Sequence, residues 1–298
     1  MTRTARVVGP EVLRQVKLIE LRTRRLVTSI FSGEYRSVFR GQGIEFAEVR
    51  GYVDGDDFRA IDWNVSARMG SPYVKTFEEE RELTLLLVVD RSGSVEFGHP
   101  RTKAEVAVEV AAVLALAAAR QNDRVGAVLF AEAVEGVVPP AKGRRHALRV
   151  IRDLIAFAPG GPGTNLTAAL AYAARLLRHR SIVVVVSDFR AAGWEQQLRR
   201  LTARNEVVAV TVDDPREYEL PDAGWIELID AETGARELVD TSDAGARTAL
   251  RIAADEQRLA RARALRSAGV DHVALRTDRP YTQTLHTAFA ARARRLAR

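Results

Sequence analysis

The sequence contains no cysteine at any of its 298 positions. This absence excludes disulfide bonds, iron–sulfur clusters, zinc sites built on thiolates and cysteine nucleophiles, and it fits a reducing compartment. Histidine is also scarce, with five residues that form neither an H-E-x-x-H motif nor any other close cluster. The sequence therefore gives no support to a zinc enzyme or a thiol enzyme.

Long apolar runs are missing as well. The longest run, Val110–Ala119, is about half of the roughly 20 residues that a bilayer-spanning helix needs. Residues 1–20 lack the continuous apolar stretch of a signal peptide. The sequence therefore predicts a soluble, cytoplasmic protein without a membrane span.

Aromatic residues make up only 6% of the chain, and its net charge of +6 comes from 45 basic and 39 acidic residues. Nucleic-acid-binding surfaces combine basic stripes with interleaved aromatic side chains. Here acidic residues are interspersed with basic ones along nearly the whole chain, so we expect no nucleic-acid partner. Only 4 of the 45 basic residues are lysines.

Apolar runs and helical periods alternate along most of the chain. Residues 10–31 carry an amphipathic helical pattern, and Pro10 suits a first helical turn. From residue 83 onward, apolar runs rich in β-branched residues predict strands, and the Ala- and Leu-rich segments between them predict helices. The expected strands are 83–89, 125–130, 134–138, 182–186, 206–212 and 272–276, and the expected helices are 103–120, 144–157, 166–178, 194–203, 246–267 and 282–298.

This alternation is typical of an α/β domain. Strands that are apolar along their whole length are buried on both faces, which predicts a mostly parallel, doubly wound sheet in three layers with helices on both sides. Two short apolar runs around a Gly-containing turn predict a β-hairpin insertion at about residues 213–245. We expect its acidic turn, with Asp230 and Glu232, to be exposed, and the insertion to be dispensable for folding. Residues 33–77 lack a helical period and should form turns and short extended pieces.

Polar residues follow two of the predicted strands. Asp90 opens the string Asp90-Arg-Ser92-Gly-Ser94 directly after the first strand, and Asp188 follows a later one. A glycine-rich loop that contains Thr164 precedes a predicted helix. Because ligands bind beyond the carboxyl ends of parallel strands, these side chains should converge at one edge of the sheet. Carboxylates and hydroxyls are hard oxygen ligands, which favour Mg²⁺ or Mn²⁺ over zinc.

Each of these motifs has an alternative explanation. An Asp after an apolar strand is also found in Walker B motifs, but the absence of a G-x-x-x-x-G-K-[ST] loop disfavours a P-loop NTPase. The loop at 160–165 can be a turn with a helix cap, since Thr and Asn are good N-caps. Two aspartates around magnesium can also serve phosphoryl chemistry, although the residue two positions after Asp90 is Ser92 and not a second Asp. A magnesium-dependent phosphoester hydrolase that uses Asp90 and Asp188 is therefore the alternative to a protein without catalytic activity.

The spacing of the five oxygen ligands resembles the metal-ion-dependent adhesion site (MIDAS) of von Willebrand factor type A domains. The resemblance implies that these residues hold Mg²⁺ or Mn²⁺ directly or through water, and that an acidic side chain of a partner completes the metal shell. It implies a type A-like domain over residues 82–298, with no catalytic residue. The five matching positions are Asp90, Ser92, Ser94, Thr164 and Asp188.

A second resemblance lies in residues 41–81, which we call the signature segment. Its strings Gly41-Gln-Gly43-Ile-Glu45-Phe46 and Gly55-Asp56-Asp57-Phe-Arg59-Ala-Ile61-Asp62-Trp63 are similar to the DUF58 family. This resemblance implies a non-enzymatic protein-interaction module, a co-chaperone or adaptor for maturation or assembly of protein complexes. The implied partner is a MoxR-type AAA+ ATPase, the client of that ATPase, or both. Many family members carry membrane spans near the N-terminus, and this sequence has none there.

The signature segment and the N-terminal helix together form the expected first part of the chain, residues 1–81. Gly55-Asp56-Asp57 predicts a tight turn in which Asp side chains cap the backbone, and nearby arginines are candidate bidentate partners. We expect the segment to clasp the N-terminal layer onto the sheet domain, because ion-pair networks more often hold structure than mark function. A partner-docking surface is the alternative. The residues expected at this interface are Arg50, Asp56, Asp57, Arg59, Asp62 and Trp63.

Overall fold

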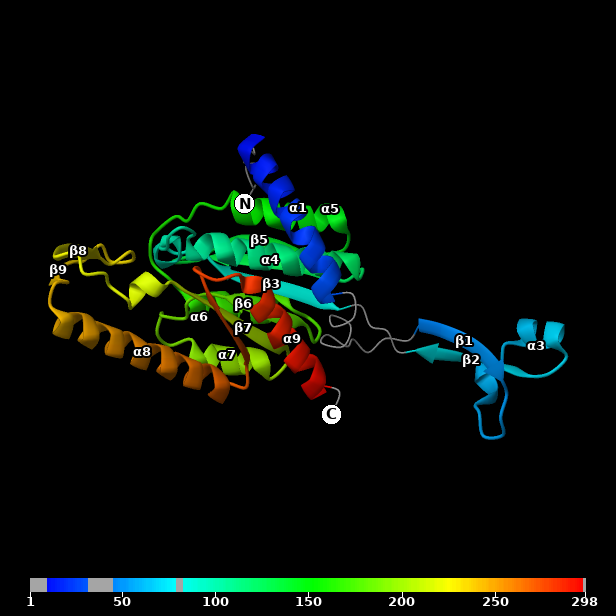
Figure 1. The fold of residues 1–298 in the computed structure, drawn as a ribbon. Coiled ribbons are helices and arrows are strands. Elements are labelled where there is room, and N and C mark those ends of the chain that lie inside the picture. Colours follow the sequence, from blue (N-terminus) through cyan, green and yellow to red (C-terminus); the bar gives the residue numbers. More distant parts are fainter. Residues whose placement is uncertain (1–9, 32–44, 79–82, 297–298) are drawn as a thin grey trace. The chain divides into compact units, whose positions relative to one another are not determined.

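The computed structural model describes residues 10–31, 45–78 and 83–296 of the chain (Figure 1). The chain divides into two compact units, each of which is described here by itself. The larger unit contains the N-terminal helix and all residues from Thr84 onward, and the smaller unit lies within residues 39–83.

The larger unit is built on a six-stranded sheet with the strand order β10-β7-β6-β3-β4-β5. Neighbouring strands are parallel except for β4 and β5, which form an antiparallel pair at one edge. This confirms the predicted α/β fold with a mostly parallel sheet. The strands are β3 (Thr84–Asp90), β4 (Arg124–Phe130), β5 (Val134–Ala141), β6 (Ile182–Val186), β7 (Glu206–Asp213) and β10 (Asp271–Arg276).

The helices of this unit lie where the periodicity predicts them, within a few residues at each end. Helix α4 begins and ends at the predicted residues, and a capping box of Thr102 and Glu105 fixes its start. The described helices are α1 (Pro10–Phe31), α4 (Lys103–Arg120), α5 (Arg144–Ile155), α6 (Leu166–Leu176), α7 (Glu195–Thr202), α8 (Ala244–Ser267) and α9 (Tyr281–Leu296). None of the helices in the described ranges is long and apolar enough to cross a bilayer.

Both faces of the sheet are buried. Leu86 and Val183 belong to a cluster with apolar residues of α6, α7 and the end of α8, while Leu85 and Leu87, which alternate with Leu86 along β3, are also fully buried. Helix α4 is buried over most of its surface because α1 and α5 pack against it in addition to β3 and β4. Helix α1 therefore belongs to the larger unit, and the predicted boundary that grouped it with the signature segment is corrected.

Strand β5 is longer than predicted, because it continues through Pro139 and Pro140 instead of ending before them. Proline cannot donate a ladder hydrogen bond, but β5 is an edge strand, where that loss is tolerated.

The predicted hairpin is present as β8 (Trp225–Ile229) and β9 (Arg236–Asp240), a separate two-stranded sheet. The residues before it pack against the domain. Asp214 is fully buried and Tyr218 is 6% exposed, on either side of the short 3-10 helix η3 (Pro215–Glu217). The inserted part is therefore narrower than the predicted 213–245.

The smaller unit is an antiparallel pair, β1 (Glu45–Gly51) and β2 (Tyr73–Glu78), joined through the 3-10 helix η1 (Phe58–Ala60) and the helix α3 (Trp63–Met69). The sequence predicts the extended pieces and the turn but not α3. That helix begins at Asp62, whose side chain accepts hydrogen bonds from two backbone N–H groups, and ends at Gly70 with φ of 73°.

Candidate metal centre

The five predicted ligands lie on two adjacent strand ends and one loop of the larger unit. Strand β3 ends at Asp90, and its neighbour β6 ends two residues before Asp188, with Val89 paired to Val186. The loop that carries Thr164 is held to the Asp90–Ser94 turn by a backbone hydrogen bond from the Gly93 N–H to the Pro162 carbonyl, 2.9 Å long. The structure thus brings the predicted residues to one edge of the sheet.

Asp90 is fully buried, and both of its oxygens accept hydrogen bonds. Its Oδ1 accepts from the Ser92 hydroxyl at 2.7 Å and from the Ser92 N–H at 3.0 Å, and its Oδ2 accepts from the Ser187 hydroxyl at 2.6 Å. Burial and then the charge of Asp188 raise the pKa of Asp90 to about 6, against the opposing effect of these hydrogen bonds. Burial therefore disfavours the charged form of Asp90, and a cation bound beside it would favour that form.

The three predicted hydroxyl ligands have different neighbours. The Ser92 Oγ is 3.2 Å from the Ser94 Oγ, so the two serines form a continuous hydroxyl pair beside Asp90. The Thr164 hydroxyl donates to Glu232, which lies in the turn of the β8–β9 hairpin. Glu232 is half-buried, so the expectation of a fully exposed acidic turn is wrong for this residue.

Asp188 is held by cations. Its Oδ2 accepts from the ammonium group of Lys103 at 3.0 Å, and its Oδ1 accepts from the Arg190 N–H at 3.2 Å. Burial alone would raise the pKa of Asp188, but the charge and hydrogen bond of Lys103, together with Arg190, lower it below its ordinary value. The ammonium group also donates to Glu217 of η3 at 2.6 Å, which makes a buried chain of three charged groups.

Sequence reasoning missed Lys103, Ser187 and Glu217. Lys103 is 1% exposed at the first position of α4. One signal was available, because only four of the 45 basic residues are lysines. In an arginine-rich chain, a lysine indicates a position that needs the small ammonium group instead of the larger guanidinium group. Ser187 directly follows β6, so the rule that brings polar residues at the ends of parallel strands to one edge also applies to it. Glu217 shows no such signal and meets the site only through the fold.

The residues at this edge fit a hard divalent cation. Their donor set consists of carboxylate and hydroxyl oxygens, which Mg²⁺ and Mn²⁺ prefer, and Asp90 lies among them as a buried carboxylate with a raised pKa. Within the described ranges no three His, Cys, Asp or Glu side chains form a metal-binding group. Any metal at this edge would therefore depend on the serine and threonine hydroxyls.

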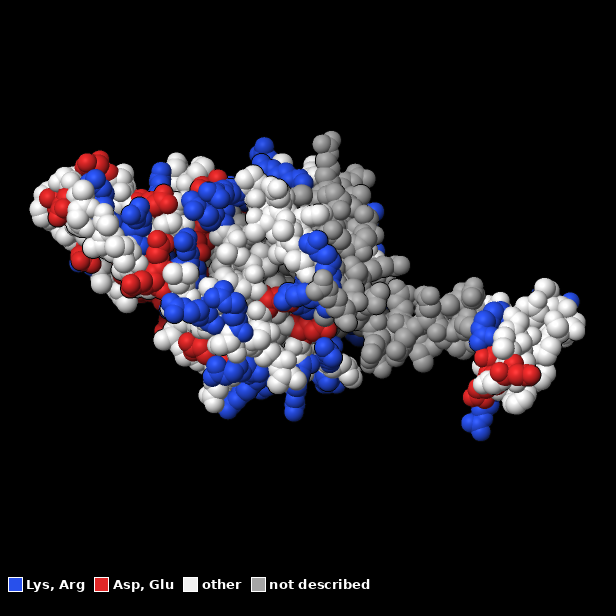
Figure 2. Space-filling model, turned by 60° about the horizontal axis from the view of Figure 1, so that its bottom comes forward, with Lys and Arg blue, Asp and Glu red and all other residues white. Residues whose placement is uncertain are grey.

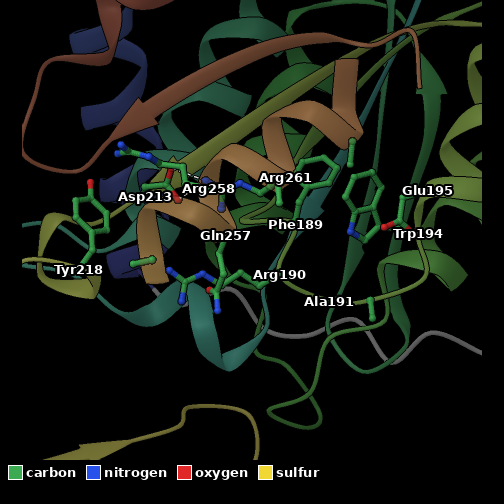
Figure 3. A pocket seen from close by; sticks show the side chains of 14 residues that line it. Phe189, Arg190, Ala191, Trp194, Glu195, Asp213, Tyr218, Gln257, Arg258 and Arg261 are labelled. Atoms are coloured by element: carbon green, nitrogen blue, oxygen red, sulfur yellow. Dashed lines mark hydrogen bonds and ion pairs between the residues drawn. The ribbon is translucent and has the colours of Figure 1, made fainter. Parts of the chain in front are cut away.

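A cavity of about 470 Å³ is lined by Phe189 and Arg190, the two residues that follow Asp188 (Figure 3). Phe189 and Trp194, whose rings meet edge to face at 5.2 Å, line one side, and Arg261 and Asp213 line another. Arg261 donates to both oxygens of Asp213 at 2.8 and 2.7 Å and to the Asp188 carbonyl at 2.7 Å. This arginine therefore fixes the backbone that follows β6.

Basic and acidic side chains are interspersed over the face of the molecule shown in Figure 2. The pattern agrees with the interspersed charges of the sequence.

The predicted interface residues of the smaller unit have mostly local partners. Arg50 and Asp56 form the expected bidentate pair, with N–O distances of 2.8 and 2.7 Å. Asp57 accepts from the Arg59 N–H at 2.9 Å, as the capping interpretation predicts. Trp63 is 69% exposed, and Asp62 caps α3. Gly41 and Gly43 of the signature segment lie outside the described residues.

Solved structures with a similar fold include BatB from Bacteroides thetaiotaomicron, which is 14% identical, has a TM-score of 0.45 and covers 72% of this chain and 98% of its own. The VWA domain of SpRpn10 is 13% identical, with a TM-score of 0.35, and covers 44% of this chain and 76% of its own. Manganese-loaded TRAP protein of Plasmodium vivax is 16% identical, with a TM-score of 0.32, and covers 44% of this chain and 57% of its own.

Sequence relatives cover more of the chain. The uncharacterized protein Rv1480 of Mycobacterium tuberculosis is 34% identical over 290 residues, which is 96% of this chain and 91% of that protein. The uncharacterized protein YeaD of Bacillus subtilis is 31% identical over 108 residues, 36% of this chain and 25% of its own. The family model "Protein of unknown function DUF58" matches residues 48–260. The chain therefore belongs to the DUF58 family.

Proposed function

We propose that this protein is a non-enzymatic, metal-dependent interaction module. The observation that carries the proposal is the buried carboxylate Asp90, surrounded by hydroxyls at the end of β3 and within the electrostatic reach of Asp188. In this proposal the larger unit is a three-layer, doubly wound domain of the von Willebrand factor type A kind.

The metal would be held by Asp90, Ser92, Ser94, Thr164 and Asp188. Mg²⁺ or Mn²⁺, when bound there, supplies a positive position that can accept one more oxygen ligand. Two protein carboxylates, one of them already paired with Lys103, leave such an ion under-neutralised. An acidic side chain of a protein partner would then gain a charge-assisted contact at the site.

The proposed partner is a MoxR-type AAA+ ATPase, or the client that such an ATPase remodels, and the proposed role is that of a co-chaperone or adaptor in the maturation of protein complexes. This part of the proposal rests on the resemblance of the signature segment to the DUF58 pattern, together with the acid-accepting chemistry of the site.

The residues after β3 favour binding over catalysis by a pair of carboxylates, because the residue two positions after Asp90 is Ser92 and not a second Asp. A magnesium-dependent phosphoester hydrolase that uses Asp90 and Asp188 is the outcome against which the proposal is tested.

The test begins with metal binding to the pure protein. Calorimetry should show that Mg²⁺ or Mn²⁺ binds the wild type, and the ion at about 100 times its Kd should stabilise the fold by about 2.7 kcal/mol, with EDTA reversing the effect. Asp90→Asn and Ser94→Ala should weaken binding, and Asp278→Asn, an exposed carboxylate far along the chain, should not.

The second part of the test uses the cognate ATPase. Pull-down in Mg²⁺ should recover the complex, and EDTA or Ser94→Ala should abolish it. Equal metal binding by the wild type and Asp90→Asn would place the metal elsewhere. Metal-dependent phosphoester turnover that is lost in Asp90→Asn would establish the hydrolase instead.

A further inference from the structure

The turn of the β8–β9 hairpin lies on the candidate metal centre. The Thr164 hydroxyl donates to the Glu232 carboxylate at 2.5 Å. A methyl group added at Gly93 would lie 2.5 Å from the Ala231 carbonyl oxygen, so the backbone of the turn packs directly over the Asp90–Ser94 loop. These two contacts connect the hairpin to two different segments of the site.

The turn is organised so that it presents Glu232. The Asp230 carboxylate accepts hydrogen bonds from the Glu232 N–H at 3.0 Å, the Thr233 N–H at 2.7 Å and the Thr233 hydroxyl at 2.8 Å. Gly234, with φ of 71°, closes the turn through a hydrogen bond to the Asp230 carbonyl. Asp230 therefore holds its own turn together, and Glu232 is the carboxylate that faces the site.

The rest of the hairpin is attached weakly. Trp225, Ile229 and Leu238 are more than half exposed, so little apolar surface fixes the two strands to the domain. At the base, the buried Thr241 donates to the Gly224 carbonyl at 2.7 Å and accepts from the Ala223 N–H at 3.0 Å. A hairpin fixed at its base and exposed along its strands can lift its turn at low cost.

We propose that the turn 230–234 is an internal ligand of this site, and that the physiological partner is an acidic protein loop whose carboxylate displaces Glu232. The inference rests on the proposed function, because it needs a site that accepts one carboxylate from outside the five ligands. The inference also defines which partners the site would select, namely protein loops that form a tight turn with one projecting acidic side chain. An occupied site also lowers the apparent affinity for the partner until the turn is lifted.

The test compares four full-length proteins. They are the wild type, Glu232→Gln, the matched control Glu237→Gln, which removes an exposed charge from the same hairpin, and a variant with residues 225–240 replaced by Asn-Gly. The replacement keeps the base, because Trp225 and Asp240 face each other in the hairpin register. The probes are Mg²⁺ alone and the acetylated, amidated peptide Asp-Ala-Glu-Thr-Gly, measured with and without EDTA.

In Mg²⁺, we expect the peptide to bind Glu232→Gln and the shortened variant at least about ten times more tightly than the wild type or Glu237→Gln. Mg²⁺ should also slow hydrogen exchange of the turn amides in the wild type and Glu237→Gln, but not in Glu232→Gln. EDTA should remove both effects.

The outcomes separate the inference from the proposed function. If all four proteins bind Mg²⁺, but Glu232→Gln matches the wild type in peptide affinity and in exchange, the internal ligand is refuted and the metal-dependent module stands. If the peptide binds none of the four proteins, the hydrogen-exchange measurement decides. Equal protection of the turn amides by Mg²⁺ in Glu232→Gln and in the wild type then refutes the inference. If no protein binds Mg²⁺, the proposed function fails and the inference fails with it.

Discussion

Replacement of Lys103 by Met tests whether the buried charges at the end of β6 form one electrostatic unit with the metal centre. The ammonium group is 1% exposed and contacts Asp188 at 3.0 Å and Glu217 at 2.6 Å. Methionine has a similar length without the charge, so the substitution removes the buried cation that contacts both carboxylates and leaves Arg190, which pairs with Glu217 at 2.9 Å, as the remaining cation beside them. Removal of one partner from a buried ion pair costs about 3–5 kcal/mol. For a unit of this size that loss corresponds to a Tm lower by about 6–20 °C.

Mg²⁺ should restore part of this loss. The variant has one positive charge fewer beside Asp188, so the ion should bind it more tightly than the wild type, and ligand stabilisation grows with the ratio of free ion to Kd. Thermal and urea unfolding, followed by circular dichroism, should show a large Tm difference between variant and wild type in EDTA and a smaller one in Mg²⁺. The control is Lys17→Met on the exposed face of α1, which should change stability by no more than about 0.5 kcal/mol.

Two results would refute this reasoning. A loss below about 1 kcal/mol in EDTA would mean that water reaches the three charges and screens them. An equal Tm increase with Mg²⁺ in the variant and the wild type would mean that Lys103 has no electrostatic influence on the metal position.

Three further changes test other parts of the structure. Arg261→Met should lower stability by about 3–5 kcal/mol in urea unfolding, because it leaves the buried Asp213 without its bidentate partner; an unchanged midpoint would contradict this. Asp62→Ala should speed hydrogen exchange in α3, because loss of the N-cap lowers the stability of the helix by about 1 kcal/mol. Unaltered exchange would show that the cap does not stabilise the helix. Replacement of residues 225–240 by Asn-Gly should leave one cooperative unfolding transition within about 1 kcal/mol of the wild type, since closing a short surface turn costs little; an insoluble product would place the hairpin in the core.

Much of the larger unit could be predicted because its signals are local. A strand such as Ile182–Val186, with five consecutive β-branched apolar residues, is buried on both sides wherever the chain places it, and α4 has both a capping box and an unbroken apolar composition. The order of such elements then fixes a mostly parallel sheet, and the polar residues that follow β3 and β6 necessarily reach the same edge. The positions of Asp90 and Asp188 were therefore predictable without any contact information.

The prediction of α3 failed for a different reason. The helix spans only Trp63–Met69, too short for an apolar period to be recognised, and no residue in it is buried. Its two signals were the cap at Asp62 and the glycine at position 70, which adopts the left-handed conformation. Both lie in the sequence, but a lone Asp and a lone Gly do not indicate a helix without an apolar period between them.

The packing of α1 was also not predictable from α1 itself. Its amphipathic pattern predicts a helix with one buried face and leaves open what covers that face. The available signal was in α4, whose apolar residues occur on all sides and require cover beyond the sheet.

The residues that complete the site could not be predicted, because they meet it through contacts distant in sequence. Lys103 lies 85 positions from Asp188, and Glu232 lies 68 positions from Thr164. The first contact depends on the loop that leads into α4, and the second depends on the turn of the β8–β9 hairpin. Neither segment has a periodic pattern from which its position at the sheet edge could be predicted.

The inserted segment serves the two sides of the site in different ways. Its first part is fixed, because Asp214 is fully buried, Tyr218 is 6% exposed and Glu217 binds the ammonium group that neutralises Asp188. Its second part, the hairpin, has exposed strands and reaches the site only at its turn, where Glu232 meets Thr164. Lifting the turn therefore breaks a short set of contacts on the Thr164 side and leaves the buried charges on the Asp188 side intact. An acidic partner could exchange with Glu232 by replacing its hydrogen bond with Thr164, while the hydrogen bonds of Asp90 and Asp188 stay in place. This separation makes a reversible, partner-controlled site compatible with a rigid core.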